Sequence, residues 1–228
     1  MKIFYTLIAA ILLSFPVLSK NEPCASTPRV FTGALADHLI AGADVVREGR
    51  GTSVPSYIRF REGSEIPLNG FTEWVKNTFK LANDYDLVLY KKSRRDALGQ
   101  VHYRFRETYK GIAVLGGEWI AHCKDGQVIS MNGVLFDDFN LPASAGLTEV
   151  LALTSALAYI GAEQYKCNMP EEEARLKWEM HDAAATYYPK GELAYAPLNG
   201  NFNSARNFKL CWKFDIYAHK PIARKEVY

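Results

Sequence analysis

Alternating side chains at residues 101–108 place the strongest constraint on how this chain folds. Mainly apolar positions alternate with polar ones, namely Val101, Tyr103, Phe105 and Glu107 against His102, Arg104, Arg106 and Thr108. A period of two residues is typical of a β-strand that buries one face. The run therefore predicts a strand with one apolar face and one charged face.

Short connections after this strand predict an antiparallel meander. Residues 109–111 read Tyr-Lys-Gly and interrupt the run, and residues 124–126 read Lys-Asp-Gly, in which Asp-Gly is a strong turn signal. Apolar runs follow each turn, at 112–122 and 127–135. We expect three strands joined by tight turns, with Gly111 at a positive φ. The pair Gly116-Gly117 predicts a bulge or a close backbone approach.

Residues 104–118 resemble the core motif of the fungalysin/thermolysin propeptide domain. The matching residues are Arg104, Phe105, Tyr109, Gly111, Ile112, Val114, Gly116, Gly117 and Glu118. The next hairpin matches the same family at Asp125, Gly126, Asn132 and Gly133. Two positions depart from the family pattern, with Glu107 in place of the usual Gln and Ala113 in place of the usual Pro. We interpret the matching residues as structural, because strand aromatics and glycines usually pack and bend sheets.

The segments before the motif complete a first domain at residues 55–140. Strand patterns at 57–61 and 86–90 flank a helical pattern at 71–81. Asp96, Gly99 and His102 resemble the lead-in to the family motif. A lone strand histidine is more often structural or exposed than a ligand, and we interpret His102 in that way.

Residues 141–228 predict a second domain. Thr148 is an expected N-cap, an apolar stripe (Val150, Leu153, Thr154, Leu157 and Ile160) predicts a helix, and Gly161 is an expected stop. Residues 171–180 predict a helix or an approach to a strand, and strands are expected at 192–196, 208–217 and 223–228. This order resembles the PepSY module, here truncated at its C-terminal strand. The predicted fold class is α+β, with two small antiparallel-sheet-plus-helix domains in tandem, the propeptide-like domain followed by the PepSY-like one.

The first 19 residues have the pattern of a secretory signal peptide. Lys2 precedes an apolar run at 3–13, and Ser19, with Val17 at the third position back from the cut, fits a cleavage site after residue 19. The run is shorter than the about 20 residues of a membrane-spanning helix. We expect a secreted, periplasmic or cell-surface protein with no membrane span. Residues 20–54 are predicted to be a poorly ordered segment, with a short helix at 37–46.

Charge and cysteine content narrow the class of protein. The 27 basic and 25 acidic residues leave a net charge of +2, which argues against nucleic-acid binding and polybasic membrane binding. The cysteines are Cys24, Cys123, Cys167 and Cys211. In an exported chain a Cys167–Cys211 disulfide is the pairing to test, with buried free thiols as the alternative. A weaker hypothesis is that the thiolate of Cys123 or Cys24 binds the zinc ion of a protease and so blocks it. It is weaker because no basic switch sequence surrounds either thiol.

No catalytic, cofactor-binding or metal-binding motif is found. The histidines are His38, His102, His122, His181 and His219, and none forms the His-Glu-x-x-His pattern that holds zinc in thermolysin-like proteases. Asp137-Asp138 is interpreted as a polar strand end, with calcium binding as a weak alternative. Residues 171–173, three glutamates, are interpreted as a helix start or a solvated run.

The resemblance implies a zymogen propeptide, a prodomain that assists folding and temporarily inhibits a thermolysin-like zinc metalloendopeptidase. The partner is then the catalytic domain in cis, which would carry the zinc and possibly calcium. The expected protease-contacting residues are Arg104 and Arg106 on the charged face and Lys124 and Asp125 at the turn. The alternatives are a stand-alone exported protease inhibitor and a non-catalytic binding module.

Overall fold

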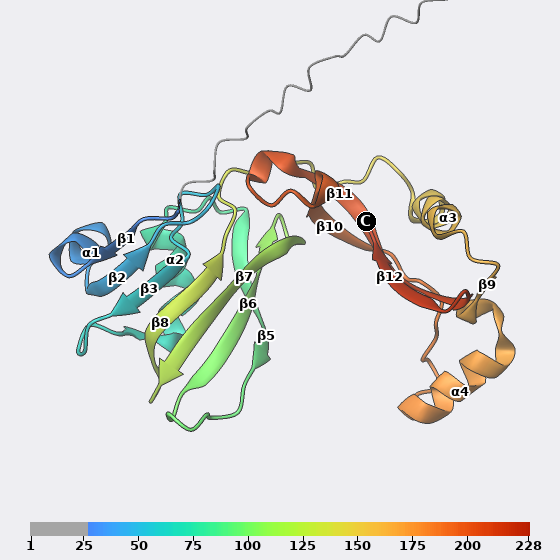
Figure 1. The fold of residues 1–228 in the computed structure, drawn as a ribbon, viewed down its shortest axis with the longest axis horizontal. Helices are drawn as coiled ribbons and strands as arrows, with labels where there is room; N and C mark the ends of the chain where they lie inside the picture. Colours follow the sequence, from blue (N-terminus) through green and yellow to red (C-terminus); the bar gives the residue numbers. More distant parts are fainter. Residues whose placement is uncertain (1–26) are drawn as a thin grey trace, which may run out of the picture.

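The computed structural model describes residues 27–228, so the predicted signal peptide and Cys24 lie outside the described part. Within it, twelve strands form one sheet, ordered β1-β2-β3-β8-β7-β10-β11-β12 along its main path (Figure 1). The strands are β1 Val30–Thr32, β2 Ala43–Arg47, β3 Tyr57–Phe60, β4 Ile66–Pro67, β5 Tyr85–Lys92, β6 Val101–Tyr109, β7 Ile112–Lys124, β8 Gln127–Val134, β9 Gln164–Tyr165, β10 Glu192–Pro197, β11 Phe208–Lys220 and β12 Ala223–Val227. The helices are α1 Ala34–Leu39, α2 Phe71–Thr78, α3 Glu149–Ile160 and α4 Pro170–Met180, with short 3₁₀ turns η1 Leu68–Gly70, η2 Lys166–Asn168, η3 Leu198–Gly200 and η4 Ala205–Asn207.

The predicted meander is confirmed in β6, β7 and β8, which pair antiparallel in order. Both turns have two successive residues at positive φ, Lys110 and Gly111 at 50° and 76°, then Asp125 and Gly126 at 49° and 81°. Such turns match the right-handed twist of the strands that they join. The predicted positive φ of Gly111 is confirmed.

The first core lies between the N-terminal part of the sheet and the helices α1 and α2. Alternate residues of β6 and β7 supply it, as do the α2 residues on one helical face. The ring of Phe71 in α2 packs on Phe105 at 4.8 Å between centroids and lies 6.4 Å from Trp119. Trp119 is fully buried. The opposite face of this part of the sheet carries the polar side chains of the same strands.

A second core joins the N-terminal and C-terminal halves of the chain. β10 pairs parallel with β7, with Tyr195 opposite Val114. Rings from both halves pack there, including Tyr109, Phe139 and Tyr195. The protein is therefore a mixed α/β fold with a large sheet and few helices. The tandem arrangement of two domains is not confirmed, because the sheet and a core continue across the expected boundary at residue 140.

The C-terminal helices begin and end as their sequences indicate. The Thr148 hydroxyl accepts a hydrogen bond from the Leu151 N–H, and Gly161 ends α3 in the left-handed conformation. Residues 171–180 are helical, within α4. The predicted apolar stripe of α3 is only partly buried, because Leu153 is 8% exposed and Val150 is 72% exposed. β11 and β12 confirm the strands expected near 208–217 and 223–228.

Two expectations for the N-terminal region are wrong. Residues 30–47 are not a poorly ordered stretch, since they form β1, α1 and β2, and β2 pairs with β3 of the main sheet. The helix predicted at 37–46 is α1 only up to Leu39, and Ala43–Arg47 is a strand. Residues 43–47 form a strand and not a helix because Ala43 and Val46 bury their side chains in the first core, which is a tertiary contact.

Of the two alternatives for Cys167 and Cys211, a disulfide or free thiols, the described residues show free thiols. Cys123, Cys167 and Cys211 are all free thiols in the described chain. Cys167 lies in η2, and Cys211 lies in β11, where it faces the carbonyl of Ala194 on β10. Burial raises the pKa of all three thiols, that of Cys123 to about 11. Cys123 is also only 3% exposed, so its sulfur is not accessible to a zinc ion of a partner, which weakens the zinc-block hypothesis for Cys123.

Candidate interaction surface

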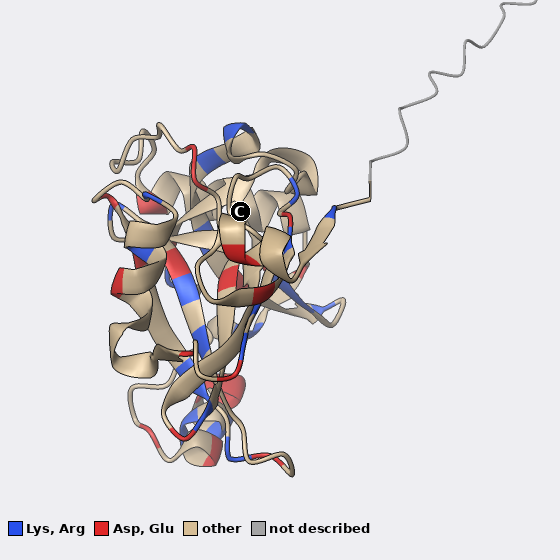
Figure 2. Cartoon of the chain, turned by 90° about the vertical axis from the view of Figure 1, so that its left-hand side faces the viewer, with Lys and Arg blue, Asp and Glu red and all other residues tan. Residues whose placement is uncertain are grey.

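The polar side of β5, β6, β7 and β8 is the candidate interaction surface, which we call the open face. It lies opposite the face that packs on α2. Its central residues come from alternate positions on neighbouring strands: Tyr90, His102, Arg104, Arg106, Glu118, His122 and Asn132. Basic and acidic positions are interspersed along the ribbon (Figure 2). The open face therefore presents both charges and neutral polar groups.

Glu118 organises the centre of the open face. Its carboxylate lies 2.5 Å from the Arg104 guanidinium and accepts a hydrogen bond from the Tyr90 hydroxyl. The Arg106 guanidinium lies 4.8 Å from the centre of the Tyr90 ring. Desolvation, and then the bond to Glu118, raise the pKa of Tyr90. We call these four side chains the arginine cluster.

The arginine cluster remains accessible to a partner. The Arg104 and Glu118 side chains are 40% and 36% exposed, and Arg106 is also exposed. Exposed ion pairs contribute about 0–1 kcal/mol to stability, and exposed cation–π contacts about 0.5–1 kcal/mol. The cluster is thus a weak contributor to folding, and its charges can be redirected to a binding partner.

The other two expected contact residues lie at the β7–β8 turn. Lys124 and Asp125 are exposed, and Asp125 pairs with Arg95 of the β5–β6 loop at 3.4 Å. The structure thus separates the four expected residues into two positions, the middle of β6 and the end of β7. It brings Tyr90 and Glu118 to the arginines. From the sequence alone, Glu118 is recognisable only as a structural motif residue and Tyr90 only as the end of a strand.

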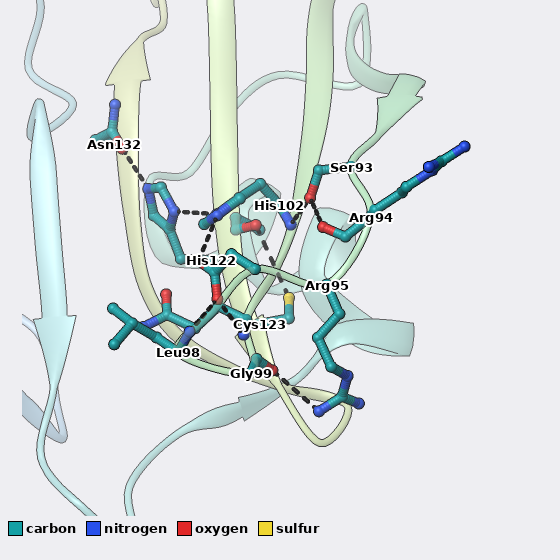
Figure 3. Close-up of polar contacts among 12 residues, drawn as sticks. Ser93, Arg94, Arg95, Leu98, Gly99, His102, His122, Cys123 and Asn132 are labelled. Atoms are coloured by element: carbon teal, nitrogen blue, oxygen red, sulfur yellow. Dashed lines mark hydrogen bonds and ion pairs between the residues drawn. The ribbon is translucent and has the colours of Figure 1, made fainter.

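A second polar group, the histidine pair, lies between the turn and the arginine cluster. His102 of β6 and His122 of β7 are direct cross-strand partners, and their Nδ1 atoms are 2.7 Å apart. His122 Nε2 lies 2.6 Å from Asn132 Oδ1, and His102 Nε2 lies 3.2 Å from Asp96 Oδ2. Figure 3 shows the rings turned toward one another, with Asn132 beyond His122. The sequence pattern indicates only a lone His102, because its pairing with His122 depends on the register between β6 and β7.

Asp96 is held in place by its own loop. Its Oδ1 accepts hydrogen bonds from the backbone N–H groups of Gln100 and Leu98 at 2.8 and 2.9 Å. The bond from Gln100 is the largest cause of a lowered pKa for Asp96. This carboxylate is therefore an acceptor for His102. The structure gives a physical reason for the spacing of Asp96, Gly99 and His102, because Gly99 makes the turn at a φ of 77°.

The remaining motif residues lie in structural positions. Phe105, Tyr109 and Val114 are buried. Gly116, at a φ of 78°, lies against the ring of Phe202, where an added Cβ would be 2.7 Å from Cε1. An added Cβ on Gly117 would lie 2.8 Å from the Cβ of Glu107. The close approach expected at the glycine pair is therefore present, and the register of β6 and β7 shifts there.

Glu107 is the main exception to an apolar interior. Its side chain is 2% exposed and accepts a hydrogen bond from the Phe136 N–H at 3.1 Å. Burial raises the pKa of Glu107 well above its ordinary value, the bond from Phe136 opposes this rise, and the nearby charge of Asp137 adds to it. A neutral carboxylic acid is then the favoured folded form, which resembles the Gln that the family motif usually has at this position.

Glu107→Gln is expected to make the stability of the protein less dependent on pH. The folded chain keeps the Glu107 proton at pH values at which the unfolded chain loses it, so its stability falls as pH rises from the ordinary Glu range toward the raised pKa. The amide cannot ionise. At pH 8 we expect the variant to unfold at a higher urea concentration than the wild type. The corresponding gain in the free energy of unfolding is about 1–3 kcal/mol. At pH 4 the two proteins should be nearly equal.

The exposed substitution Glu62→Gln is the matched control and should show no such difference. An equal effect of Glu107→Gln at both pH values would contradict the interpretation of Glu107 as a buried neutral acid.

The acidic runs act as local structural groups. Asp137 accepts hydrogen bonds from the Ser53 hydroxyl and backbone N–H and from the Thr52 hydroxyl, which closes the segment before β3. The glutamates at 171–173 form the first turn of α4, as one interpretation expected. Glu172 there pairs with Lys166 at 3.0 Å. In residues 27–228, no three or more side chains of the His, Cys, Asp and Glu types are grouped to hold a metal ion.

Comparison with known proteins agrees with the motif. Residues 90–135 match the family described as the Fungalysin/Thermolysin Propeptide Motif. The chain is 30% identical over 159 residues to proteins named thermolysin from Alicyclobacillus acidocaldarius subsp. acidocaldarius and from Bacillus caldolyticus. Each match covers 64% of this chain and 28% of the relative, so the chain spans less than a third of their length. None of the helices in residues 27–228 has the length and apolarity needed to cross a bilayer.

Proposed function

We propose that this chain is the prodomain of an exported thermolysin-like zinc metalloendopeptidase. The observation that carries the proposal is the match of residues 90–135 to the propeptide family. These residues include the whole β6–β7–β8 meander and hence the open face. The catalytic domain, with zinc and possibly calcium, would lie outside this chain, and residues 141–228 would be the PepSY-like part of the same prodomain.

The first proposed role is that of an intramolecular chaperone. Folds that depend on pairing between distant residues form slowly and expose aggregation-prone surface on the way. The meander pairs strands close in sequence, so it can form early and present its open face as a template. A folded neighbour on the same chain then lowers the barrier for the protease that follows.

The second proposed role is temporary inhibition of the protease. A tether keeps the prodomain at a high effective concentration near the catalytic cleft, so a modest interface suffices until the tether is cut. The arginine cluster is the proposed contact, because its charges contribute little to folding. Lys124 and Asp125 at the β7–β8 turn form a second proposed contact.

Replacing Arg104 and Arg106 together by alanine is expected to weaken inhibition. The purified chain is added in trans to purified thermolysin, and cleavage of a fluorogenic peptide reports the inhibition constant. We expect the inhibition constant to rise about tenfold, equivalent to about 1.4 kcal/mol. The double variant Arg206→Ala/Lys209→Ala removes the same charge from exposed positions outside the open face and should inhibit like the wild type.

Unchanged inhibition by the Arg104/Arg106 variant would reject the arginine cluster as the contact. Absence of inhibition by the wild type, together with no gain in refolding yield of the denatured protease, would reject the prodomain roles themselves. Two alternatives would then remain. A stand-alone inhibitor would block other metalloproteases in trans, whereas a non-catalytic binding module would bind none of them.

A further inference from the structure

The oxygen partners of the histidine pair determine which ring nitrogens carry hydrogen. A carboxylate oxygen of Asp96 and the amide oxygen of Asn132 only accept hydrogen bonds, so each facing Nε2 carries the hydrogen and donates it. A neutral imidazole has a single N–H. The Nδ1 atoms of His102 and His122 are then both left with a lone pair. Two such atoms 2.7 Å apart, a hydrogen-bond distance, repel each other unless a proton is shared between them or both lone pairs bind one metal ion.

We propose that His102 and His122 bind one divalent transition-metal ion, such as Zn²⁺ or Cu²⁺, through their Nδ1 atoms. Imidazole nitrogen is a favourable ligand for both ions. Histidines that bind metal almost always donate their other N–H to a carboxylate or another oxygen, which fixes the ring orientation. Asp96 and Asn132 supply this outer support in the described structure. The two strands supply the rigid frame, since the histidines are paired in register.

The geometry fits the ion after a small adjustment. Zinc–nitrogen bonds are about 2.0–2.1 Å long, so two nitrogens on a tetrahedral ion lie about 3.3 Å apart. The present separation is 2.7 Å, so binding of the ion requires the two Nδ1 atoms to move apart by about 0.6 Å. The side chain of His102 is 30% exposed, so an ion can enter from solvent.

Two protein ligands define the kind of site. Because no larger group of metal-binding side chains is found in residues 27–228, the other positions of the ion fall to water or to a donor from a docked partner. We therefore expect moderate affinity and rapid exchange rather than a structural zinc centre. The ion would connect β6 and β7 next to the arginine cluster. This proposal stands independently of the protease partner.

Calorimetric titration of the purified chain with ZnCl₂ tests the proposal. We expect one ion per chain and a dissociation constant that rises at least about tenfold in His102→Gln and in His122→Gln. Asp96→Ala removes the outer support of His102, together with the loop bonds from Leu98 and Gln100, and should weaken binding by about 10-fold or more. Asn132→Asp should bind at least as tightly as the wild type, because a carboxylate can only accept from His122. His38→Gln removes an exposed histidine of α1 and should change nothing.

Nitrogen NMR of the wild-type protein makes the test independent of variants that fold poorly. Added Zn²⁺ should shift the Nδ1 resonances of His102 and His122 and leave both Nε2 atoms protonated. Absence of zinc binding, with one hydrogen shared between the Nδ1 atoms, would overturn the proposal. A shared proton rather than a metal ion would then join the two rings. An equal loss of affinity in His38→Gln and His102→Gln would also overturn it, because binding would then be adventitious.

Discussion

Replacing Gly133 by alanine is expected to destabilise the protein by about 3 kcal/mol or more. Gly133 of β8 lies opposite Trp119 of β7. An added Cβ would lie 2.8 Å from the Cα of Trp119 and would also overlap the carbonyl oxygen of Glu118. These atoms belong to the backbone of a buried central strand, so they cannot move without separating β7 from β8. Overpacking of side chains typically costs about 1–3 kcal/mol, and a backbone collision exceeds that range.

Thermal unfolding measures this effect. For a chain of this size, 3 kcal/mol corresponds to a fall in Tm of roughly 6–12 °C. The matched control is Gly146→Ala, because an added Cβ there meets nothing within 4 Å and its φ is ordinary. That variant should keep the wild-type Tm. A Gly133→Ala protein with an unchanged Tm would show that β7 and β8 tolerate more separation than their register indicates.

Replacing Tyr195 by alanine is expected to destabilise both halves of the protein at once. Tyr195 is fully buried, with its ring centroid 5.6 Å from that of Tyr109 and 5.8 Å from that of Phe139. Its hydroxyl donates a hydrogen bond to the carbonyl of Pro142 at 2.9 Å. Removing a large buried aromatic side chain typically costs about 3–5 kcal/mol. Because the ring lies between the halves, that loss should weaken both.

Hydrogen exchange of individual amides measures how far the effect spreads. In Tyr195→Ala, amides of β6 and of β11 should lose protection together. Tyr195→Phe removes only the hydroxyl and should cost about 0.5–1.5 kcal/mol, while Tyr188→Ala, at an exposed tyrosine, should cost almost nothing. Loss of protection confined to β10, β11 and β12 would instead support two independent tandem domains.

Local patterns in the sequence were sufficient to predict most of the strands and helix ends. The two-residue period at 101–108 predicted β6, and the Lys-Gly and Asp-Gly turns predicted its two partners. Thr148 and Gly161 predicted the ends of α3. Each signal acts through hydrogen bonds or φ angles within a few residues, so it is independent of the rest of the fold. The same signals allowed the family resemblance of residues 90–135 to be seen.

Contacts between distant residues decided what these patterns predicted wrongly or left open. Residues 43–47 have an ambiguous pattern, and pairing with β3 made them a strand. The thiols of Cys167 and Cys211 share a region of the sequence but lie in separate elements. Continuous pairing from β7 to β10 joined two segments that the sequence separates into domains.

The histidine pair shows most clearly what the sequence determined and what only the tertiary structure decided. The turn between β6 and β7 sets Tyr109 opposite Ile112, and regular pairing from there would place Trp119 opposite His102. The bulge at Gly116-Gly117 instead adds three residues to β7, so that His122 faces His102. The sequence determined that a bulge forms, because two glycines interrupt a strand. Its size depends on the space that Glu107 and Phe202 occupy beside those glycines, and only the folded chain brings these side chains there.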